Sequence, residues 1–438
     1  MSTATREGTV EAFLIEGGAP LSGTVRPAGN KNAALPILAA SLLTADPVTL
    51  ENVPRIRDVE ELLELMARIG VEIEWKARNT VRVWAADVTS TRLDPELCER
   101  IRASILLAGP LLARFGSADV PPPGGDVIGR RRVDTHLMAF EALGATVEVG
   151  REYLLRAPGG LRGADIHLDE ASVTGTENAV MAAAMARGTT RIGNAACEPH
   201  VQDLCRLLER MGARIEGIGS NVLTVHGAQE LRGCTHRIGS DHIEVASFIG
   251  LAAVTGGDLV IEDAAIEHMR AIRHSFSRLG IEVECDSERD TMRVRAGQSL
   301  EIVDDLHDQI PKIEDGPWPM FPADLTSIAV AVATQARGTV LIFEKMFENR
   351  LFFTDKLVSM GARIILCDPH RAVITGPGKL YAHRMESPDI RAGMALLIAS
   401  LCAEGTSRIG NVGQIDRGYE RIDERLRALG ARIERVEA

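Results

Sequence analysis

Six copies of one short phrase divide this chain into units of similar length. In each copy an amphipathic helix ends at a glycine, and a strand of alternating apolar and polar residues follows, as in RIGVEIEW around Gly70. A glycine lets the chain leave a helix in the left-handed conformation, and the alternation is typical of a strand with one covered face. The glycines stand 68 to 81 residues apart: Gly70, Gly144, Gly212, Gly280, Gly361 and Gly430.

A second phrase lies ahead of each of these glycines. It joins a helix of small apolar residues to a turn and a β-branched strand, as in AMARGTTRI at Gly188 and TQARGTVLI at Gly338. The helices over residues 179–186 and 328–336 are apolar on nearly all sides, so we expect them to be buried. Six such units are too many for one core. The pattern predicts an α/β protein with two domains of three units each, helices inside and sheets outside; a doubly wound sheet is the alternative.

Composition excludes several classes of protein. The 438 residues carry 49 Lys+Arg against 61 Asp+Glu, a net charge of −12, with 4% aromatic residues, which argues against nucleic acid as a partner. The seven cysteines are scattered without a C-x-x-C pair, so we expect no disulfide framework or zinc site. No signal peptide or membrane span is visible, and we expect a cytoplasmic protein without a membrane partner. Phosphate-loop, zinc-protease and serine-hydrolase motifs are missing from the sequence, and no cofactor or metal is implied.

Polar phrases stand beside apolar helices in the N-terminal half. Lys31 and Asn32 open a helix whose free N–H groups can bind an anion, and Arg102 opens another apolar segment. A Pro/Gly-rich loop over residues 121–136 contains Asp126 and three successive arginines at positions 130–132. Adjacent arginines repel one another, so a bound polyanion would explain them. Each feature also has a simpler explanation. The segment at Lys31 can be a plain helix cap with the lysine in solvent, Arg102 can be a snorkelling side chain, and the loop with the arginines can be solvated.

The C-terminal half has four phrases of the same kind, with acids and cations at matching points of successive units. They are FPAD with Asp324, FENR with Arg350, PDIR with Asp389 and Arg391, and IDRGY with Asp416 and Arg417. We expect Asp389 to pair with Arg391, and Asp416 with Arg417. Each pair alone is explained by a structural ion pair, but their matching positions favour a shared cleft.

Together these phrases resemble a known family, the enolpyruvyl transferases. The resemblance rests on GNKNAALPILAA, RASILLAGPLLARFG, PGGDVIGRRRVD, FPAD, FENR, DIRAG and IDRGYERI, in order along nearly the whole chain. It implies a two-domain inside-out α/β barrel with six repeated βαβαββ units, three per domain. The expected domains are residues 31–239, with a mobile loop at 121–136, and residues 1–30 together with 240–438.

The resemblance also implies an activity. The enolpyruvyl group of phosphoenolpyruvate would pass to the 3-hydroxyl of UDP-N-acetylglucosamine with release of phosphate, the first committed step of peptidoglycan synthesis. One alternative is the same chemistry on another nucleotide or sugar acceptor. A second alternative is a paralogue that binds ligands without turnover.

Matched position by position, the resemblance implies roles for individual residues. Lys31, Arg131 and Arg417 match cations that bind phosphoenolpyruvate, and Lys31 and Arg417 are also expected to act in catalysis. Asp324 matches the base that takes the proton of the acceptor hydroxyl. Asp389 and Arg391 match a second acid–cation pair in the cleft. The residues matched to the sugar nucleotide are Asn32, Arg102, Arg132, Val133, Asp134, Thr135, His136, Ser172, Val173 and Met346.

The chain departs from the family pattern at several positions. Asp126 stands where relatives have a loop cysteine, and we expect it to act as the proton donor in place of the thiol. An aspartate is ordinarily ionised at pH 7, so it can donate only if bound substrate keeps a proton on it. Cys197 and His242 stand where relatives have arginine. The remaining departures are Arg130, Arg132, Thr174, Gln414 and a longer stretch over residues 304–318.

Overall fold

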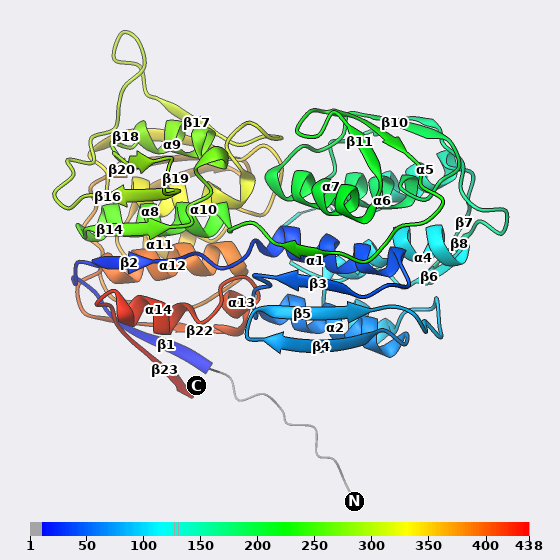
Figure 1. Cartoon of the computed structure of the whole chain (residues 1–438). Coiled ribbons are helices and arrows are strands. Elements are labelled where there is room, and N and C mark those ends of the chain that lie inside the picture. The colour runs from blue at the N-terminus through cyan, green and yellow to red at the C-terminus, as the bar shows by residue number, and fades with distance from the viewer. Residues whose placement is uncertain (1–10, 127, 130, 438) are drawn as a thin grey trace, which may run out of the picture.

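The computed structural model describes residues 11–126, 128–129 and 131–437. Two hydrophobic cores lie within it, one built from residues 33–238 and the other from residues 13–25 together with 243–433. We call the parts of the chain around these cores the first lobe and the second lobe, and Figure 1 shows them side by side. No helix in the described residues is long and apolar enough to cross a membrane.

Within the described residues each lobe carries three separate sheets. In strand order, those of the first lobe are β13 (Thr235–Arg237), β3 (Val48–Glu51), β5 (Thr80–Trp84) and β4 (Glu72–Ala77); β11 (Arg214–Glu216), β12 (Val222–His226), β10 (Thr189–Gly193) and β9 (Asp165–His167); and β6 (Ser117–Val120), β8 (Tyr153–Arg156) and β7 (Thr146–Val149). Those of the second lobe are β21 (Arg384–Glu386), β22 (Thr406–Gly410), β1 (Glu11–Glu16) and β23 (Arg432–Glu437); β15 (Glu284–Asp286), β16 (Thr291–Val294), β14 (Leu259–Glu262) and β2 (Gly23–Val25); and β17 (Lys312–Glu314), β18 (Gly338–Phe343), β20 (Arg371–Gly376) and β19 (Arg363–Asp368).

The four-stranded sheets share one pairing scheme. In each of them one pair of strands is parallel and the other two pairs are antiparallel, as in β9 with β10, β10 with β12 and β12 with β11. The three-stranded sheet β6–β8–β7 is antiparallel and has a parallel bridge from Arg92 to Asp119. The described chain is therefore a mixed α/β protein with several open sheets, and the alternative of one doubly wound sheet is wrong.

The strand that follows each of the six recurring glycines lies at the edge of its sheet: β4, β7, β11, β15, β19 and β23. All six glycines have positive φ, between 78° and 111°, as the pattern predicts for a residue that ends a helix. Strand β11 and the start of β23 alternate between exposed and buried as predicted, whereas β15 is more exposed, with all three residues in solvent. The reason is that an edge strand has a neighbouring strand on one side only.

The helices form a buried set and a covering set. Those of the buried set are α1 (Lys31–Ala40), α4 (Ala108–Phe115) and α6 (Val173–Ala183) in the first lobe and α8 (His242–Thr255), α10 (Thr326–Ala333) and α12 (Ile390–Cys402) in the second, with η2 (Arg102–Leu107) leading into α4 and η4 (Ala323–Leu325) into α10. The buried η1 (Ser41–Leu43) follows α1, and the covering helices are α2 (Arg57–Arg68), α3 (Pro95–Cys98), α5 (Asp134–Ala142), α7 (Pro199–Met211), α9 (Arg270–Ser277), α11 (Thr354–Ser359), α13 (Gly413–Asp416), α14 (Ile422–Ala428) and η3 (Ile266–His268). Burial of α6 and α10 confirms the expectation for the small-residue helices.

Two neighbouring segments connect the lobes. The backbone N–H of Asn30 donates to the oxygen of Gly239 at 2.8 Å, and that of Asp241 donates to the oxygen of Ala28 at 2.9 Å. Helices α1 and α8 begin directly after these segments. The pairing therefore holds the starts of two buried helices, one from each lobe, next to each other.

The buried position of α12 can be tested with two isoleucines. Ile398 in α12 has no exposed surface, whereas Ile365 in β19 is 68% exposed. We expect Ile398→Ala to lower the free energy of unfolding by about 2–5 kcal/mol, because it leaves a cavity in the core. Ile365→Ala should change it by less than about 0.5 kcal/mol. Urea unfolding followed by circular dichroism measures both values, and equal losses in the two variants would contradict the buried position.

Candidate functional site

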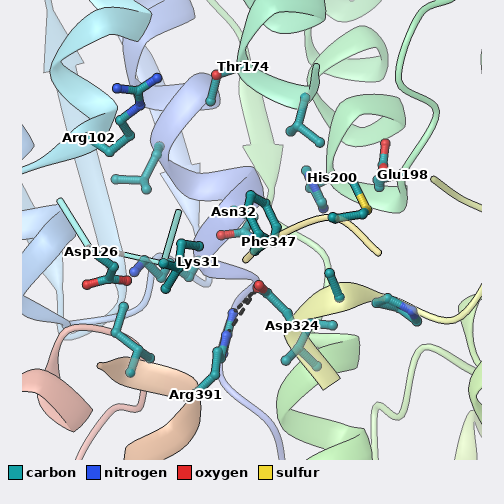
Figure 2. A pocket seen from close by; sticks show the side chains of 18 of the residues that line it. Lys31, Asn32, Arg102, Asp126, Thr174, Glu198, His200, Asp324, Phe347 and Arg391 are labelled. Carbon is teal, nitrogen blue, oxygen red and sulfur yellow. Dashed lines mark hydrogen bonds and ion pairs between the residues drawn. The ribbon is translucent and has the colours of Figure 1, made fainter. Parts of the chain in front are cut away.

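A cavity of about 260 Å³ lies where the N-terminal ends of the buried helices meet. Its walls come from both lobes, and Figure 2 shows it from close by. A helix N-terminus has free N–H groups and a partial positive charge, so several of them around one space favour bound anions. The residues that line the cavity from these ends are Lys31 and Asn32 of α1, Arg102 of η2, Val173 and Thr174 of α6, His242 of α8, Asp324 of η4 and Arg391 of α12.

Lys31 lies in the cavity wall and not in bulk solvent. Asn30 caps α1 by accepting a hydrogen bond from the backbone N–H of Ala33 at 3.0 Å, and Lys31 is 7% exposed. Its Nζ lies 2.7 Å from Oδ2 of Asp58 in α2, and Nε of Arg417 in the second lobe lies 2.8 Å from Oδ1 of the same carboxylate. Burial raises the pKa of Asp58, but the two cations outweigh it and bring the pKa below its ordinary value. Asp58 therefore holds one cation from each lobe.

The Pro/Gly-rich loop reaches this pair of cations. Asp126 forms an ion pair with Arg417. Nη2 of Arg102 donates to the backbone oxygens of Arg131 and Arg132 at 3.0 and 2.9 Å, which fixes the end of the loop. Burial lowers the pKa of Arg131, and within the described residues no hydrogen bond or ion pair engages its side chain. The Arg131 guanidinium is thus placed to receive an anion.

Asp324 lies between two arginines of the second lobe. Its Oδ2 accepts hydrogen bonds from Nη2 and Nε of Arg391 at 2.8 and 3.1 Å, as Figure 2 shows, and its Oδ1 accepts one from Nη2 of Arg350 at 3.1 Å. Burial alone would raise the pKa of Asp324, yet Arg391 and Arg350 hold it well below its usual range. The carboxylate form of Asp324 is therefore strongly favoured.

The two predicted pairs of neighbouring charges do not form. Asp389 caps α12 instead, and its Oδ1 accepts the backbone N–H of Arg391 at 2.8 Å. Asp416 pairs with Arg435 at 2.8 Å, while Arg417 turns to Asp58. These predictions are wrong because the capping carboxylate of Asp389 is occupied by backbone N–H groups, and Asp416 and Arg417, adjacent at the end of α13, each have a partner in another element.

Most of the site residues predicted from the sequence meet at the cavity. Those that line it are Lys31, Asn32, Arg102, Asp126, Arg131, Val173, Asp324, Met346, Asp389, Arg391 and Arg417. Those that do not are Arg132, Val133, Asp134, Thr135, His136 and Ser172, which lie before α5, in its first turn and at the cap of α6. Thr135 and His136 are buried and bond within the protein, Thr135 to Asp169 at 2.7 Å and His136 to Thr174 at 3.1 Å. Their contact with a substrate stays a prediction.

Several departures from the family pattern also lie at the site. Thr174 and His242 line the cavity, and Sγ of Cys197 lies 3.2 Å from the backbone oxygen of Trp318, another lining residue. Gln414 accepts a hydrogen bond from Arg417 at 2.9 Å. The stretch 304–318 includes the loop ahead of β17 that projects from the second lobe in Figure 1. Arg130 lies outside the described residues.

Five titratable residues that line the cavity were not predicted as site residues from the sequence: Asp58, Glu177, Glu198, His200 and Arg350, the last quoted without a role. Asp58 has the pattern of a surface acid in the first turn of an amphipathic helix, so nothing in the sequence signals its position. Glu177 does carry a signal, because it is the one acid within the apolar helix α6. In the part of the chain that the structure describes, no group of three or more His, Cys, Asp or Glu side chains could hold a metal ion.

The role of Asp58 predicts a dependence of stability on pH. Its pKa is lowered on folding, so it contributes stability above its pKa in the unfolded chain, about 4, and that contribution is lost as the pH falls toward the folded pKa. The wild type should lose free energy of unfolding below about pH 4. Asp58→Asn should lose less in that range, starting from a lower value at neutral pH because Lys31 and Arg417 are left without their anion.

Urea unfolding at a series of pH values measures this difference. Asp165→Asn is the matched control, since that side chain is 75% exposed in a surface pair, and it should follow the wild type. Curves of the same shape for wild type and Asp58→Asn would contradict the proposed role of the carboxylate.

Sequence comparison finds relatives along almost the whole chain. A UDP-N-acetylglucosamine 1-carboxyvinyltransferase from Bradyrhizobium diazoefficiens is 60% identical over 424 residues, which are 97% of this chain and 98% of the relative. The protein of the same name from Treponema denticola is 54% identical over 422 residues, 96% of this chain and 98% of the relative.

Solved structures with the same fold are more distant in sequence. The enolpyruvyl transferase NikO from Streptomyces tendae has a TM-score of 0.85 at 24% identity, covering 98% of this chain and 100% of its own. An EPSP synthase from Acinetobacter baumannii has a TM-score of 0.76 at 18% identity, with the same coverage. Residues 15–426 match the family of EPSP synthase (3-phosphoshikimate 1-carboxyvinyltransferase). As its sequence phrases predict, the chain belongs to the EPSP synthase family of enolpyruvyl transferases.

Proposed function

We propose that this chain transfers the enolpyruvyl group of phosphoenolpyruvate to the 3-hydroxyl of UDP-N-acetylglucosamine and releases phosphate, the first committed step of peptidoglycan synthesis. The observation that carries the proposal is the meeting of Lys31, Arg131 and Arg417 at one cavity with the carboxylates of Asp126 and Asp324. Two relatives named for this activity, 60% and 54% identical, support the choice of acceptor. We further propose a cytoplasmic location, in keeping with seven free cysteines.

The charge of the cavity suits both substrates. Phosphoenolpyruvate and a nucleotide diphosphate together bring about five negative charges into one site, which requires several fixed cations. The cationic residues on the cavity wall are Lys31, Arg102, Arg131, Arg350, Arg391 and Arg417, against the four aspartates Asp58, Asp126, Asp324 and Asp389. Lys31, Arg131 and Arg417 would bind phosphoenolpyruvate. Asn32 and Arg102, with Val173 and Met346, would face the sugar nucleotide.

The chemistry is an addition followed by an elimination. In the addition, Asp324 takes the proton of the acceptor hydroxyl, the oxygen forms a bond to C2 of phosphoenolpyruvate, and Asp126 gives a proton to the methylene carbon C3. In the elimination, C3 returns a proton to Asp126, the bond from C2 to the phosphate oxygen breaks, and Asp324 gives the proton that it took from the hydroxyl to the leaving phosphate. The double bond re-forms, and the enol ether and inorganic phosphate are released.

Substrate binding would prepare both carboxylates, each of which is paired with arginine in the structure. A substrate phosphate competes with Asp126 for Arg417, and the negative charge beside Asp126 then favours its protonated form. Arg391 and Arg350 lower the pKa of Asp324, so Asp324 becomes an effective base when substrate anions draw one of these guanidiniums away.

The fold proposed for this reaction is the inside-out α/β barrel, with six sheets as six βαβαββ units. We propose domains at residues 31–239 and at 1–30 with 240–438, which fits the two cores and the paired connecting segments. Closure of the domains and of a mobile loop at 121–136 would exclude water, so that the activated enol ether is not hydrolysed.

Phosphate release from purified protein, phosphoenolpyruvate and a panel of nucleotide sugars tests the proposal. We expect release with UDP-N-acetylglucosamine. Asp324→Asn should lower kcat by about 10²–10⁴-fold while UDP-N-acetylglucosamine still binds, because it removes the base. Release only with a different acceptor would replace the proposed substrate, and saturable binding without turnover would indicate a ligand-binding paralogue.

The aspartate at position 126 predicts resistance to a thiol-alkylating epoxide such as fosfomycin. The wild type should keep full activity after long incubation with it, because the loop offers no thiol nucleophile. Asp126→Cys is the matched variant, and it should lose activity with time because it supplies that thiol. Time-dependent covalent inactivation of the wild type would contradict the placement of Asp126 at the reacting position.

A further inference from the structure

One end of the cavity is polar but has no cation–carboxylate pair. It is lined by Glu177 of α6, by Glu198 and His200 at the start of α7, and by Trp318, and we call it the Glu177 end. Figure 2 shows Glu198 and His200 on the opposite side of the cavity from Asp126. The two ends of the same cavity therefore differ in chemistry.

Glu177 is an unusual residue for its position. It is 1% exposed, and its Oε1 has no hydrogen-bond partner within the described residues, although it is the one acid in a buried helix. A buried polar atom without a partner is costly, and the great majority of such atoms in proteins are bonded. Because Glu177 lines the cavity, a ligand in the cavity could supply the missing partner.

Glu198 and His200, which line the same end of the cavity, also have buried polar atoms without a hydrogen-bond partner among the described residues. These atoms are Oε2 of Glu198 and Nδ1 of His200, and His200 is 6% exposed. No ion pair between described residues involves Glu177 or Glu198. Burial raises the pKa of both acids, Glu198 raises that of Glu177 further, and burial lowers the pKa of His200 to about 3. Backbone N–H groups oppose the shift in Glu198, so the protonated form is favoured for Glu177 and the neutral form for His200.

We propose that Glu177, Glu198 and His200 form a subsite for the uncharged sugar part of the acceptor, with the buried carboxyl group of Glu177 donating a hydrogen bond to one of its hydroxyl or amide oxygens. This inference rests on the proposed function. The phosphate of phosphoenolpyruvate would bind at the other end, where Lys31 and Arg417 lie. Trp318 adds an aromatic wall, as is common where a few placed polar groups orient a ligand.

Two substitutions at one position test the proposal. Glu177→Leu removes the donor, and Glu177→Gln keeps an uncharged donor of similar size. Calorimetric titration gives the Kd of each variant for UDP-N-acetylglucosamine and for UDP, which lacks the sugar. We expect Glu177→Leu to raise the Kd for UDP-N-acetylglucosamine about tenfold and to leave the Kd for UDP unchanged. Glu177→Gln should stay within about threefold of the wild type for both.

Three results would overturn the subsite: no change in Glu177→Leu, an equal change for UDP and UDP-N-acetylglucosamine, or a loss in Glu177→Gln as large as that in Glu177→Leu. If Glu177→Leu does not fold, infrared difference spectra of the wild type replace it. UDP-N-acetylglucosamine, but not UDP, should then shift the carbonyl stretch of a protonated carboxylic acid, and no shift would refute the proposal.

Turnover separates this inference from the proposed function. A wild type that turns over UDP-N-acetylglucosamine while Glu177→Leu binds it normally contradicts the subsite alone. A wild type that binds UDP-N-acetylglucosamine without releasing phosphate contradicts the proposed function, and the sugar-dependent loss in Glu177→Leu would still support the subsite.

Discussion

A helix that is buried on nearly every side has room for charged side chains only near its ends, and this constraint decides where the chemistry of the fold can lie. The buried helices begin at the same cavity, so Lys31, Asp324 and Arg391 stand together although they are far apart in sequence. Their positive ends add to the cationic side chains. The preference for anions is therefore created locally by helix placement, within a molecule whose net charge is −12.

Carboxylates form ion pairs with most of these cations and so reduce the repulsion among them. Asp58 joins Lys31 to Arg417, and Asp324 joins Arg391 to Arg350. Such buried pairs contribute little net stability, but removal of one partner leaves an uncompensated charge and is costly. The pairs therefore hold the cations in position without neutralising all of them, since Arg131 has no partner within the described residues. Incoming phosphate would find the site already arranged.

The sequence predicts the units of the fold better than the pairs in the site. Glycine after an amphipathic helix fixes a local conformation, and all six copies have it. The meeting of Lys31, Arg131 and Arg417 follows from the family resemblance and could not be read from spacing, because it depends on how two lobes pack. The predicted ion pair between Asp389 and Arg391 is wrong for the same reason. The two residues are close in sequence, but the partner of Arg391 is Asp324, 67 residues away. Asp58 gives no signal in its own helix, since its partners come from other elements.

The departures from the family pattern are explained best when they are considered together. Thr174 and His242 line the cavity, and Cys197 contacts the backbone of Trp318 on the same wall. The family resemblance matches Cys197 and His242 to arginines, and neither residue adds a permanent cation near the Glu177 end. A buried acid without a cation, such as Glu177, is more stable protonated than ionised. A protonated carboxyl group donates a hydrogen bond to an uncharged oxygen, whereas a carboxylate can only accept. The Glu177 end of the cavity thus suits a neutral group, while the opposite end has Lys31 and Arg417 for phosphate.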